Sequence, residues 1–367
     1  MPSLPTDPAY VALALVPGIG KARLDALLAA FGSPGAVLEA PQEALRAVPG
    51  MTPAAATAIR ETSPAVGQKL IDRAQAHGGT VLAPADGRFP PMLRLIPEAP
   101  TLLFAAGRLE LLARPAVAIV GSRSHTRYGA EACRHLAGGL ARAGLVVVSG
   151  MARGIDAIAH NAALDVGGDT IGVLGNGLGV VYPSANRTLY ESVAARGCLL
   201  TEHPPGEKPH AGSFPRRNRL ISGLARVTVV VEARAKSGAL ITADNALSQG
   251  HDVLAVPGPI TSPLSAGCNR LIQQGAKPAL GLRDVLEEYG LAASAEVPAA
   301  SVPADLTEHE RRTLAALTTD PEHVDGVALR VDLPPWDLLA VLTSLEIRGL
   351  VIQEPGKAFR RAEGMLR

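Results

Sequence analysis

The chain has 367 residues, of which 47% are hydrophobic and 19% are charged, and its formal net charge is +1. This composition excludes an intrinsically disordered chain, and the length predicts two or three domains rather than a single core. Because the whole chain is nearly neutral, a polyanionic partner can be argued only from local basic patches.

The first 64 residues predict a small helical domain with a weak internal repeat. Val16-Pro17-Gly18-Ile19-Gly20 precedes one helical pattern, and Val48-Pro49-Gly50-Met51 precedes a second. Each resembles the turn of a helix-hairpin-helix (SAM-like) unit, whose backbone N–H groups can hold a DNA phosphate. Two interpretations stay open: Lys21 and Arg23 contact a phosphate beside the first turn, or the two hairpins only pack together as a helical cap.

Residues 65–288 predict an α/β domain. After a proline-rich stretch, short Val- and Ile-rich runs alternate with helical segments from Val117 onward. The runs occupy residues 117–121, 145–150, 170–175, 198–202, 227–233 and 252–258. Nearly continuous apolar strands separated by helices predict a Rossmann-like, doubly wound and mainly parallel sheet that is covered on both faces. Ligands of such sheets bind at the carboxyl ends of the strands.

Two neighbouring strand ends predict an anion site. The first expected strand ends in Gly121-Ser122-Arg123 and the second in Ser149-Gly150-Met151-Ala152-Arg153-Gly154, and a helical pattern follows each. Glycine allows a tight turn, the hydroxyl and the helix N-terminus supply hydrogen-bond donors, and arginine supplies a fixed charge. One such turn is an ordinary βα connection, whereas two side by side favour a phosphate site.

Asp156 and His160 lie four residues apart on the helix expected after the second strand. That spacing suits a metal ion or an acid–base pair, but the sequence offers no third ligand. We therefore expect a helix-start aspartate and a solvent-facing histidine, and we predict no metal site.

The third expected strand ends in a glycine-rich loop, Gly175-Asn176-Gly177-Leu178-Gly179. Its spacing matches neither a Walker loop nor the GxGxxG dinucleotide fingerprint. The fingerprint is also absent after the first strand. We therefore predict no ATP, NAD or other cofactor.

Phe214-Pro215-Arg216-Arg217-Asn218-Arg219 is the most specific stretch of the chain. Residues 201–236 contain 7 Lys/Arg and 3 Asp/Glu, a local net charge of +4. An aromatic ring beside guanidinium groups is typical of single-stranded nucleic-acid sites, where a base stacks and a phosphate is paired. Two points stay open: Phe214 could instead anchor the helix to the core, and at least one of the three arginines should be structural.

The C-terminal part predicts a linker and a further domain. Residues 289–304 are rich in alanine and proline, as expected of a linker, and residues 305–367 show three helical patterns followed by a short hairpin. Thr307 and Glu310 form a capping-box signature at the first of these helices. The pattern resembles a winged-helix domain.

The charge of this winged-helix-like segment argues against DNA readout. Residues 305–367 carry 8 Lys/Arg and 11 Asp/Glu, a net charge of −3, and the expected recognition helix includes Asp337 and Glu346. Carboxylates facing phosphates lower affinity, so we favour a protein-contact or regulatory role. A basic edge that the net charge hides could be formed by Arg348, Lys357, Arg360 and Arg361.

Six motifs together carry a family resemblance. In chain order they are GSR(x4)YG, SGMARGID, YP(x2)N, FPRRNRLISGL, VVVEA(x3)SGALITA and AVPG. Over about residues 70–280 they resemble the DNA-processing protein A (DprA/Smf) family. The resemblance implies a non-enzymatic protein that binds and protects incoming single-stranded DNA during natural transformation and recombination. It also implies a homodimer formed through the Rossmann-like domain, and loading of a RecA-type recombinase.

The resemblance and the basic segment together give a set of candidate DNA contacts. They are Gly121, Ser122, Arg123, Ser149, Gly150, Arg153, Gly154, Phe214, Arg216, Asn218, Arg219, Ser237, Gly238 and Thr242. The family often carries a lysine shortly before the phenylalanine, where this chain has His210-Ala211-Gly212-Ser213. Arg187 or Lys208 could take its place, and we include Arg187 among the candidates.

The competing hypothesis is a nucleotide 5′-monophosphate phosphoribohydrolase of the lysine-decarboxylase-like fold. Those enzymes resemble this chain in a GSR-type loop and an arginine-rich segment, and they carry two catalytic carboxylates in a later strand-end turn. In register, these carboxylates fall on Ile241 and Thr242. A missing general acid–base group costs about 10²–10⁴-fold in rate, so we predict a binding protein rather than an enzyme.

Cysteine usage and the N-terminus predict a cytoplasmic location. Cys133, Cys198 and Cys268 are more than sixty residues apart, which excludes a CxxC metal site and argues against a disulfide framework. The first twenty residues show no basic n-region, and no stretch approaches the roughly 20 apolar residues of a membrane span. The dimer interface, the DNA sequence preference and the strand selectivity of the terminal domains stay open.

Overall fold

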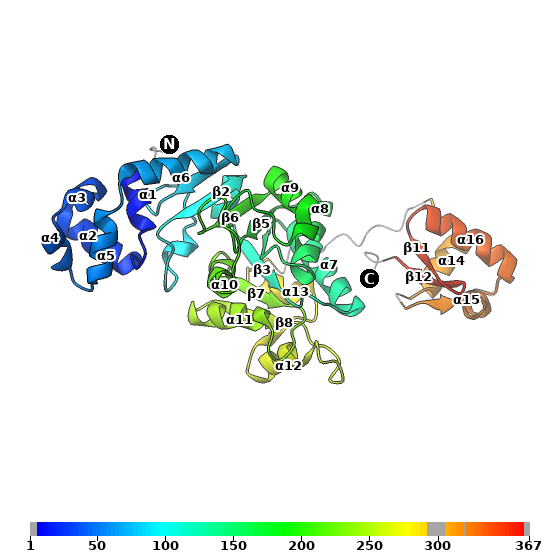
Figure 1. Ribbon diagram of the computed structural model, residues 1–367. Coiled ribbons are helices and arrows are strands. Elements are labelled where there is room, and N and C mark those ends of the chain that lie inside the picture. Colours follow the sequence, from blue (N-terminus) through cyan, green and yellow to red (C-terminus); the bar gives the residue numbers. More distant parts are fainter. Residues whose placement is uncertain (1–5, 292–304, 319, 363–367) are drawn as a thin grey trace. The chain divides into compact units, whose positions relative to one another are not determined.

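The computed structural model describes residues 6–291, 305–318 and 320–362. It forms two compact units, Met1–Ala295 and Glu296–Arg367, whose elements are labelled in Figure 1. The linker predicted over residues 289–304 lies outside the described residues from 292 onward. Within the described ranges, the structure has no helix with the length and apolar character needed to cross a membrane.

Six helices open the first unit. They are α1 (Pro8–Ala14), α2 (Lys21–Phe31), α3 (Pro34–Glu39), α4 (Gln42–Arg46), α5 (Pro53–Arg60) and α6 (Pro64–Ala76). Proline stands in the first turn of α1, α3, α5 and α6, where its missing N–H is not needed. Helices α1 and α6 pack against each other, and α6 contacts the first strand. Thus the helical region extends past residue 64 to Ala76 and is joined directly to the sheet.

The two turns of the weak repeat are tied together by one side chain. The Arg23 guanidinium donates to the carbonyl oxygen of Gly18 in the first turn and to that of Gly50 in the second. Arg23 is therefore engaged inside the helical region, as expected if the two hairpins pack together, and of the two basic residues predicted there Lys21 is the more available.

A nine-stranded sheet follows the helices and confirms the predicted doubly wound, mainly parallel fold. Its strands are β1 (Gly79–Leu82), β2 (Leu103–Gly107), β3 (Ala116–Val120), β4 (Val146–Ser149), β5 (Thr170–Val173), β6 (Cys198–Thr201), β7 (Val227–Val230), β8 (Asp252–Ala255) and β9 (Lys277–Pro278). The spatial order is β1-β2-β6-β5-β4-β3-β7-β8-β9. In this spatial order, the seven strands that begin with β6 and end with β9 are parallel to one another. Strand β2 pairs antiparallel with both β6 and β1. The six predicted runs are β3 to β8.

Strand order places a switch point between β3 and β7. The chain runs from β3 to β4, β5 and β6 on one side and then returns to place β7, β8 and β9 on the other. Loops leaving the carboxyl ends of β3 and β7 therefore diverge, which opens a crevice where ligands of such sheets bind.

Helices cover both faces of the sheet, as Figure 1 shows. One face packs on α7 (Arg127–Arg142), α8 (Ile155–Asp165) and α13 (Leu282–Glu287), and the other on α10 (Ser213–Gly223), α11 (Gly238–Ser248) and α12 (Ala266–Gln273). Alternate residues of β3 serve the two sides: Val117 and Ile119 join the first layer, and Ala118 and Val120 join the second. Helix α9 (Arg187–Arg196) packs on β2, β5 and β6.

The second unit has the predicted winged-helix arrangement. Its elements are α14 (Glu308–Ala316), β10 (Glu322–His323), α15 (Val324–Val331), α16 (Pro335–Ile347), β11 (Val351–Glu354) and β12 (Ala358–Arg361). Thr307 and Glu310 cap α14 reciprocally, as their spacing predicts. Leu338, Leu342 and Leu345 of α16 lie at helical spacing and are fully buried, so this unit has its own core.

Candidate functional site

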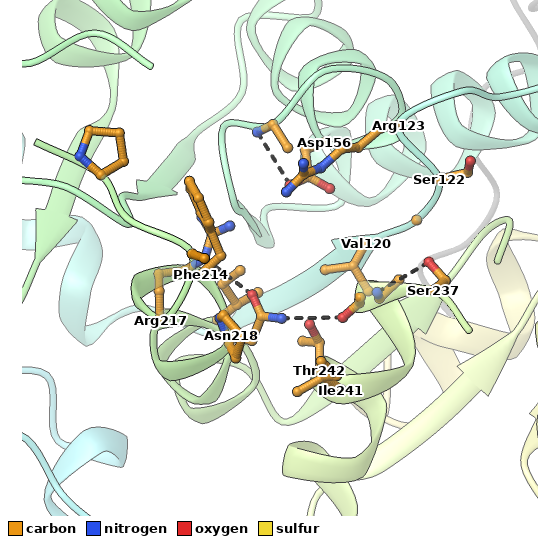
Figure 2. A pocket seen from close by; sticks show the side chains of 18 of the residues that line it. Val120, Ser122, Arg123, Asp156, Phe214, Arg217, Asn218, Ser237, Ile241 and Thr242 are labelled. Atoms are coloured by element: carbon orange, nitrogen blue, oxygen red, sulfur yellow. Dashed lines mark hydrogen bonds between the residues drawn. The ribbon is translucent and has the colours of Figure 1, made fainter. Parts of the chain in front are cut away.

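A pocket of about 820 Å³ opens at the switch point between β3 and β7. Figure 2 shows side chains from the loop after β3, from α8, from α10 and from the loop after β7 meeting around it. Of the predicted DNA contacts, the lining includes Gly121, Ser122, Arg123, Phe214, Asn218, Ser237, Gly238 and Thr242. The topology thus brings residues more than a hundred positions apart into one site.

The loop after β3 presents Arg123 to the pocket, whereas the Ser122 hydroxyl forms hydrogen bonds within the loop. The Ser122 hydroxyl donates to the Ser124 carbonyl at 2.7 Å and accepts from the Ser124 amide at 3.1 Å. The start of α7 is closed by protein groups as well, because the Thr126 amide and hydroxyl both donate to the Glu232 carboxylate. Glu232 thus takes up the donors of Thr126, and Arg123 is the charged group that this loop offers to the pocket.

The loop after β4 packs tightly under the loop after β3. Gly154 has a left-handed φ of 80°, and a Cβ there would stand 2.3 Å from the Ser122 carbonyl oxygen. At Gly150 a Cβ would meet the Arg217 guanidinium at 2.6 Å. Ser149 is fully buried and its hydroxyl donates to the Ile119 carbonyl oxygen. These three residues hold the site in shape, and none of them lines the pocket.

Asp156 and Arg217 put opposite charges beneath the pocket floor. The Arg217 guanidinium donates to the carbonyl oxygens of Gly150 and Val173, and burial lowers its pKa to about 10. Burial raises the pKa of the Asp156 carboxyl, and the neighbouring Arg217 charge acts in the opposite direction. Because Arg217 stays charged at neutral pH, it partly offsets the cost of the buried carboxylate. Arg217 is thus one structural arginine of the basic segment.

The prediction of a solvent-facing His160 is wrong. His160 is fully buried, and its Nδ1 lies 2.6 Å from the Thr170 hydroxyl, which donates to the Val147 carbonyl oxygen. Burial lowers the pKa of His160 to about 3, so the imidazole is neutral. The position four residues after Asp156 faces the sheet because α8 lies across β4 and β5. Among the described residues, no group of three or more His, Cys, Asp or Glu side chains is placed to hold a metal ion.

An aromatic pair stands at the mouth of the pocket. The rings of Phe214 and Tyr182 lie 5.4 Å apart at an interplanar angle of 33°, and the Arg123 guanidinium carbon lies 5.6 Å from the centre of the Phe214 ring. Tyr182 is 44% exposed. Phe214 also touches the backbone at Gly175, where a Cβ would stand 2.8 Å from its ring. Phe214 is therefore packed on one side and faces the pocket on the other, as Figure 2 shows.

The opposite wall is the start of α11. The Ser237 hydroxyl caps this helix by accepting from the Ala239 amide at 3.3 Å, and no atom stands near a Cβ built at Gly238. Asn218 ties α10 to this wall by donating to the Gly238 carbonyl oxygen at 3.2 Å. Thr242 is buried behind it. Since the first N–H groups of a helix lack partners within it, this helix start gives the pocket a second anion-favouring element.

Four predicted arginines lie outside this pocket. Arg153 lines a smaller cavity of about 40 Å³ that shares Arg123 and Phe214 with the main one. Arg187 is exposed at the start of α9 and lines none of the described pockets. Arg216 and Arg219 lie on another face of α10, beside Glu202. Arg219 is buried and Arg216 is exposed, so Arg217 and Arg219 are the two buried arginines of the basic segment.

Among the lining residues that the sequence did not single out are Tyr182, His210 and Arg234. Tyr182 and Arg234 belong to motifs after β5 and β7, and an aromatic or basic residue in a strand-end loop is the same signal that selected Phe214 and Arg123. Arg123, Arg217 and Arg234 face a single carboxylate, Asp156, in the lining. A pocket with this charge balance, an exposed Tyr182 and a half-buried Phe214 can hold phosphates and stack a planar base.

Comparison with known families agrees with this geometry. The family model of DNA recombination-mediator protein A matches residues 80–290, which is more than half of the chain. The DprA winged helix domain matches residues 297–357, and the SAM-like helix-hairpin-helix tandem matches residues 11–62.

Individual relatives cover most of both chains. The chain is 36% identical over 329 residues to Protein Smf of Synechocystis, spanning 80% of this chain and 83% of the relative. It is 48% identical over 204 residues to DNA processing protein DprA of Streptococcus pneumoniae, spanning 56% of this chain and 72% of the relative.

Two solved structures share the fold. The X-ray structure of DNA processing protein A from Streptococcus pneumoniae superposes with a TM-score of 0.68 at 36% identity, covering 78% of this chain and 99% of that one. DNA processing protein A from Helicobacter pylori, described with a unique single-stranded DNA binding mode, gives 0.53 at 30% identity, covering 57% and 95%. By fold, motifs and sequence, the chain belongs to the DNA-processing protein A (DprA/Smf) family.

Proposed function

We propose that this protein binds single-stranded DNA in the pocket between β3 and β7. The observation that carries the proposal is the triad of Arg123, Phe214 and Tyr182, in which a guanidinium, a half-buried ring and an exposed ring stand together at the pocket. A base can stack on these rings while its phosphate pairs with Arg123 or Arg234. The single-stranded DNA binding mode described for the Helicobacter pylori relative supports the same ligand.

We propose that this binding serves natural transformation and recombination without catalysis. The protein would protect incoming strands and load a RecA-type recombinase, and its family membership supports both roles. Ile241 and Thr242 line the pocket where the competing phosphoribohydrolases need two carboxylates. Asp156, the single carboxylate of the lining, lies beneath the loop after β4, whose Ala152 amide is 3.4 Å from it.

We propose a homodimer formed by the α/β domain in the cytoplasm. Ile260 after β8 and Leu280 after β9 are 95% and 76% exposed, and they follow adjacent strands at one edge of the sheet. Exposed apolar side chains at a sheet edge support self-association. Light scattering of Ile260→Asp with Leu280→Asp should report a monomer, and an unchanged mass would place the interface elsewhere. The three buried, unpaired cysteines support a reducing compartment.

The test of the main proposal is a salt titration of binding to labelled oligo-dT and to a duplex of equal length. Tight single-strand binding that weakens with a slope of about 0.7 per neutralised phosphate is expected. In parallel, AMP is incubated with the protein and ribose phosphate is measured. Release of ribose phosphate that is lost in Asp156→Asn, with no retention of oligo-dT, would favour the enzyme instead.

A further inference from the structure

A second large cavity lies on the other side of α10. Its volume is about 860 Å³, and it is part of the first unit. One wall is the end of α1, the first hairpin turn and the start of α2, and the other is formed by residues 94–102, Glu202 and α10. The pocket between β3 and β7 and this cavity share no lining residue, so α10 separates two distinct hollows.

The residues of α10 alternate between the two hollows. Phe214 and Asn218, one helical turn apart, line the pocket between β3 and β7. Arg216 and Arg219 are also one turn apart but on a different face, and they line the second cavity. Two of the three arginines of the basic segment therefore line the second cavity instead of the first pocket.

Basic groups stand on both walls of the second cavity. Arg216 is 65% exposed and meets Glu202 only at 3.6 Å. On the facing wall Lys21 is the first residue of α2, whose N-cap Gly20 provides no side-chain hydrogen bond. The first-turn N–H groups and the Lys21 ammonium thus favour an anion there, although Lys21 also pairs with Asp25 in its own helix. The charged lining residues are Lys21, Arg23, Arg94, Arg216 and Arg219 against Asp25, Glu98 and Glu202.

Arg219 supplies a second, independent pointer to an anion. Its side chain is 10% exposed, and its Nη2 donates to Glu202 at 2.7 Å. Its Nε reaches only the exposed Glu98 carboxylate at 3.9 Å, and its Nη1 has no hydrogen-bond partner among the described residues. A buried guanidinium N–H without an acceptor costs free energy, and an acceptor bound in the cavity would remove that cost.

The two walls are held in place by hydrogen bonds. The Tyr10 hydroxyl of α1 donates to the carbonyl oxygen of Thr101, which lines the cavity. Arg23 fixes the first hairpin turn through Gly18 and Gly50. The two walls that carry the basic groups are therefore positioned before any ligand arrives, which lowers the entropic cost of binding.

We propose that the second cavity binds a phosphodiester group of the same nucleic-acid strand that occupies the pocket between β3 and β7. The strand would cross α10 and be held on both sides of it, by Phe214 and Arg123 on one side and by Arg216, Arg219 and Lys21 on the other. This inference rests on the proposed function. It makes the N-terminal hairpin turn part of a second binding site for long strands.

The test compares short and long strands. Wild type and Lys21→Ala with Arg216→Ala are titrated by fluorescence anisotropy with oligo-dT of about 6 and about 30 nucleotides. We expect the double variant to lose roughly tenfold in affinity for the long strand, with a salt slope shallower by about 1.4, since each lost phosphate contact contributes about 0.7. Affinity for the short strand should not change. The matched control, Arg142→Ala with Arg283→Ala, removes two exposed charges from α7 and α13 on the opposite face.

A variant that should strengthen binding of the long strand provides a further test. Asp25→Asn removes the carboxylate that pairs with Lys21, so it should tighten binding of the long strand about twofold to threefold and leave the short strand unchanged. If wild type and the Lys21–Arg216 double variant bind the long strand equally well and melt at the same temperature, the second binding site is wrong but the proposed function stands. Equal losses on both strands also overturn the second binding site. If wild type binds neither strand, the proposed function itself fails.

Discussion

The pocket between β3 and β7 and the C-terminal winged-helix unit differ in how their cations are placed. In the pocket, Arg123 and Arg234 are exposed and have no ion-pair partner among the described residues. In the winged-helix unit, Arg348 pairs with Asp305 and Arg330 pairs with Glu322. Two regions that both look suited to DNA therefore differ in where their cations stand. Those of the pocket line one hollow, whereas in the winged-helix unit Arg330 and Arg348 are paired and Lys357 is exposed on the hairpin.

The winged-helix unit also exposes large apolar side chains. Trp336, at the start of α16, is 72% exposed, and Leu329 and Ile347 are more than 80% exposed. Asp337 follows Trp336 directly, which places a carboxylate at the start of the helix that would enter a DNA groove. Exposed apolar side chains beside carboxylates suit a protein partner better than a sugar-phosphate backbone. A candidate DNA site is therefore better judged by cations and aromatic rings that line one hollow than by the net charge of a domain.

The largest effect on stability is expected from replacing Arg217, the buried cation in the pocket floor. Arg217→Leu would leave the buried Asp156 carboxylate without its cation and two carbonyl groups without a donor. Losing one partner of a buried charge pair costs about 3–5 kcal/mol of unfolding free energy. Urea unfolding measures the loss. By contrast, Arg348→Leu in the winged-helix unit, where Arg348 is half-exposed, should change the unfolding free energy by less than about 1 kcal/mol.

The Arg217→Leu effect should depend on pH in a defined direction. An aspartate ionises near pH 3.9 in the unfolded chain, whereas burial raises the pKa of folded Asp156. The cost of the buried charge is therefore absent below about pH 3.9 and complete above the raised folded pKa. Without Arg217 that folded pKa rises further, so the stability gap between variant and wild type should shrink as the pH falls toward 4. A gap that is constant with pH would mean that Asp156 is not the cause.

A strong effect on binding is expected from Arg123→Ala. A charge-assisted hydrogen bond contributes about 1.5–3 kcal/mol, so affinity for oligo-dT should fall about tenfold or more for every base sequence. The salt slope should become shallower by about 0.7–1. Arg142→Ala, on the opposite face of the sheet, is the control. If folded Arg123→Ala protein keeps the wild-type affinity and salt slope, the pocket is not the main binding site for the strand, and the winged-helix unit becomes an equal candidate.

Phe214 distinguishes stacking from anchoring. If a base stacks on Phe214, both Phe214→Ala and Phe214→Leu should lose about 1–3 kcal/mol of binding free energy, because neither keeps the aromatic face. If the ring mainly packs against Gly175, leucine should preserve both stability and binding while alanine lowers the melting temperature. Binding and thermal unfolding measured on the same two variants separate the two outcomes.

The smallest effect should come from removing the winged-helix unit. Truncation is best placed after residue 295, because a cut near residue 288 would remove Tyr289, whose hydroxyl donates to the Ala116 carbonyl oxygen. Affinity for oligo-dT of about 10 nucleotides should stay within about twofold, since the removed unit is acidic. Strands of about 50 nucleotides, a duplex and protein partners should be more sensitive. A large loss on the short strand would promote the winged helix to a primary DNA site.

The sheet and the loops that surround the main pocket could be predicted from the residue pattern alone. Apolar runs such as those of β3 and β7 are long enough for buried strands only, and Gly121 and Arg234 mark where the apolar pattern ends. Parallel strands bring all their carboxyl ends to one edge, so loops distant in the sequence must meet. Arg123, Phe214 and Ser237 could therefore be assigned to one site from their places in the pattern. Strand β9 was missed because two residues give no periodicity.

Only the tertiary structure decided which of these polar groups are available to a ligand. Arg216, Arg217 and Arg219 are consecutive or nearly so, yet Arg217 is buried in the floor of the pocket, and the other two face the second cavity. His160 is turned into the core by the packing of α8. The start of α7 is closed by Glu232, which lies 106 residues from Thr126. Residue type and spacing set what a side chain can do, but its partners come from elements far away in the sequence, and the packing of those elements decides whether the group is used inside the protein or left for a ligand.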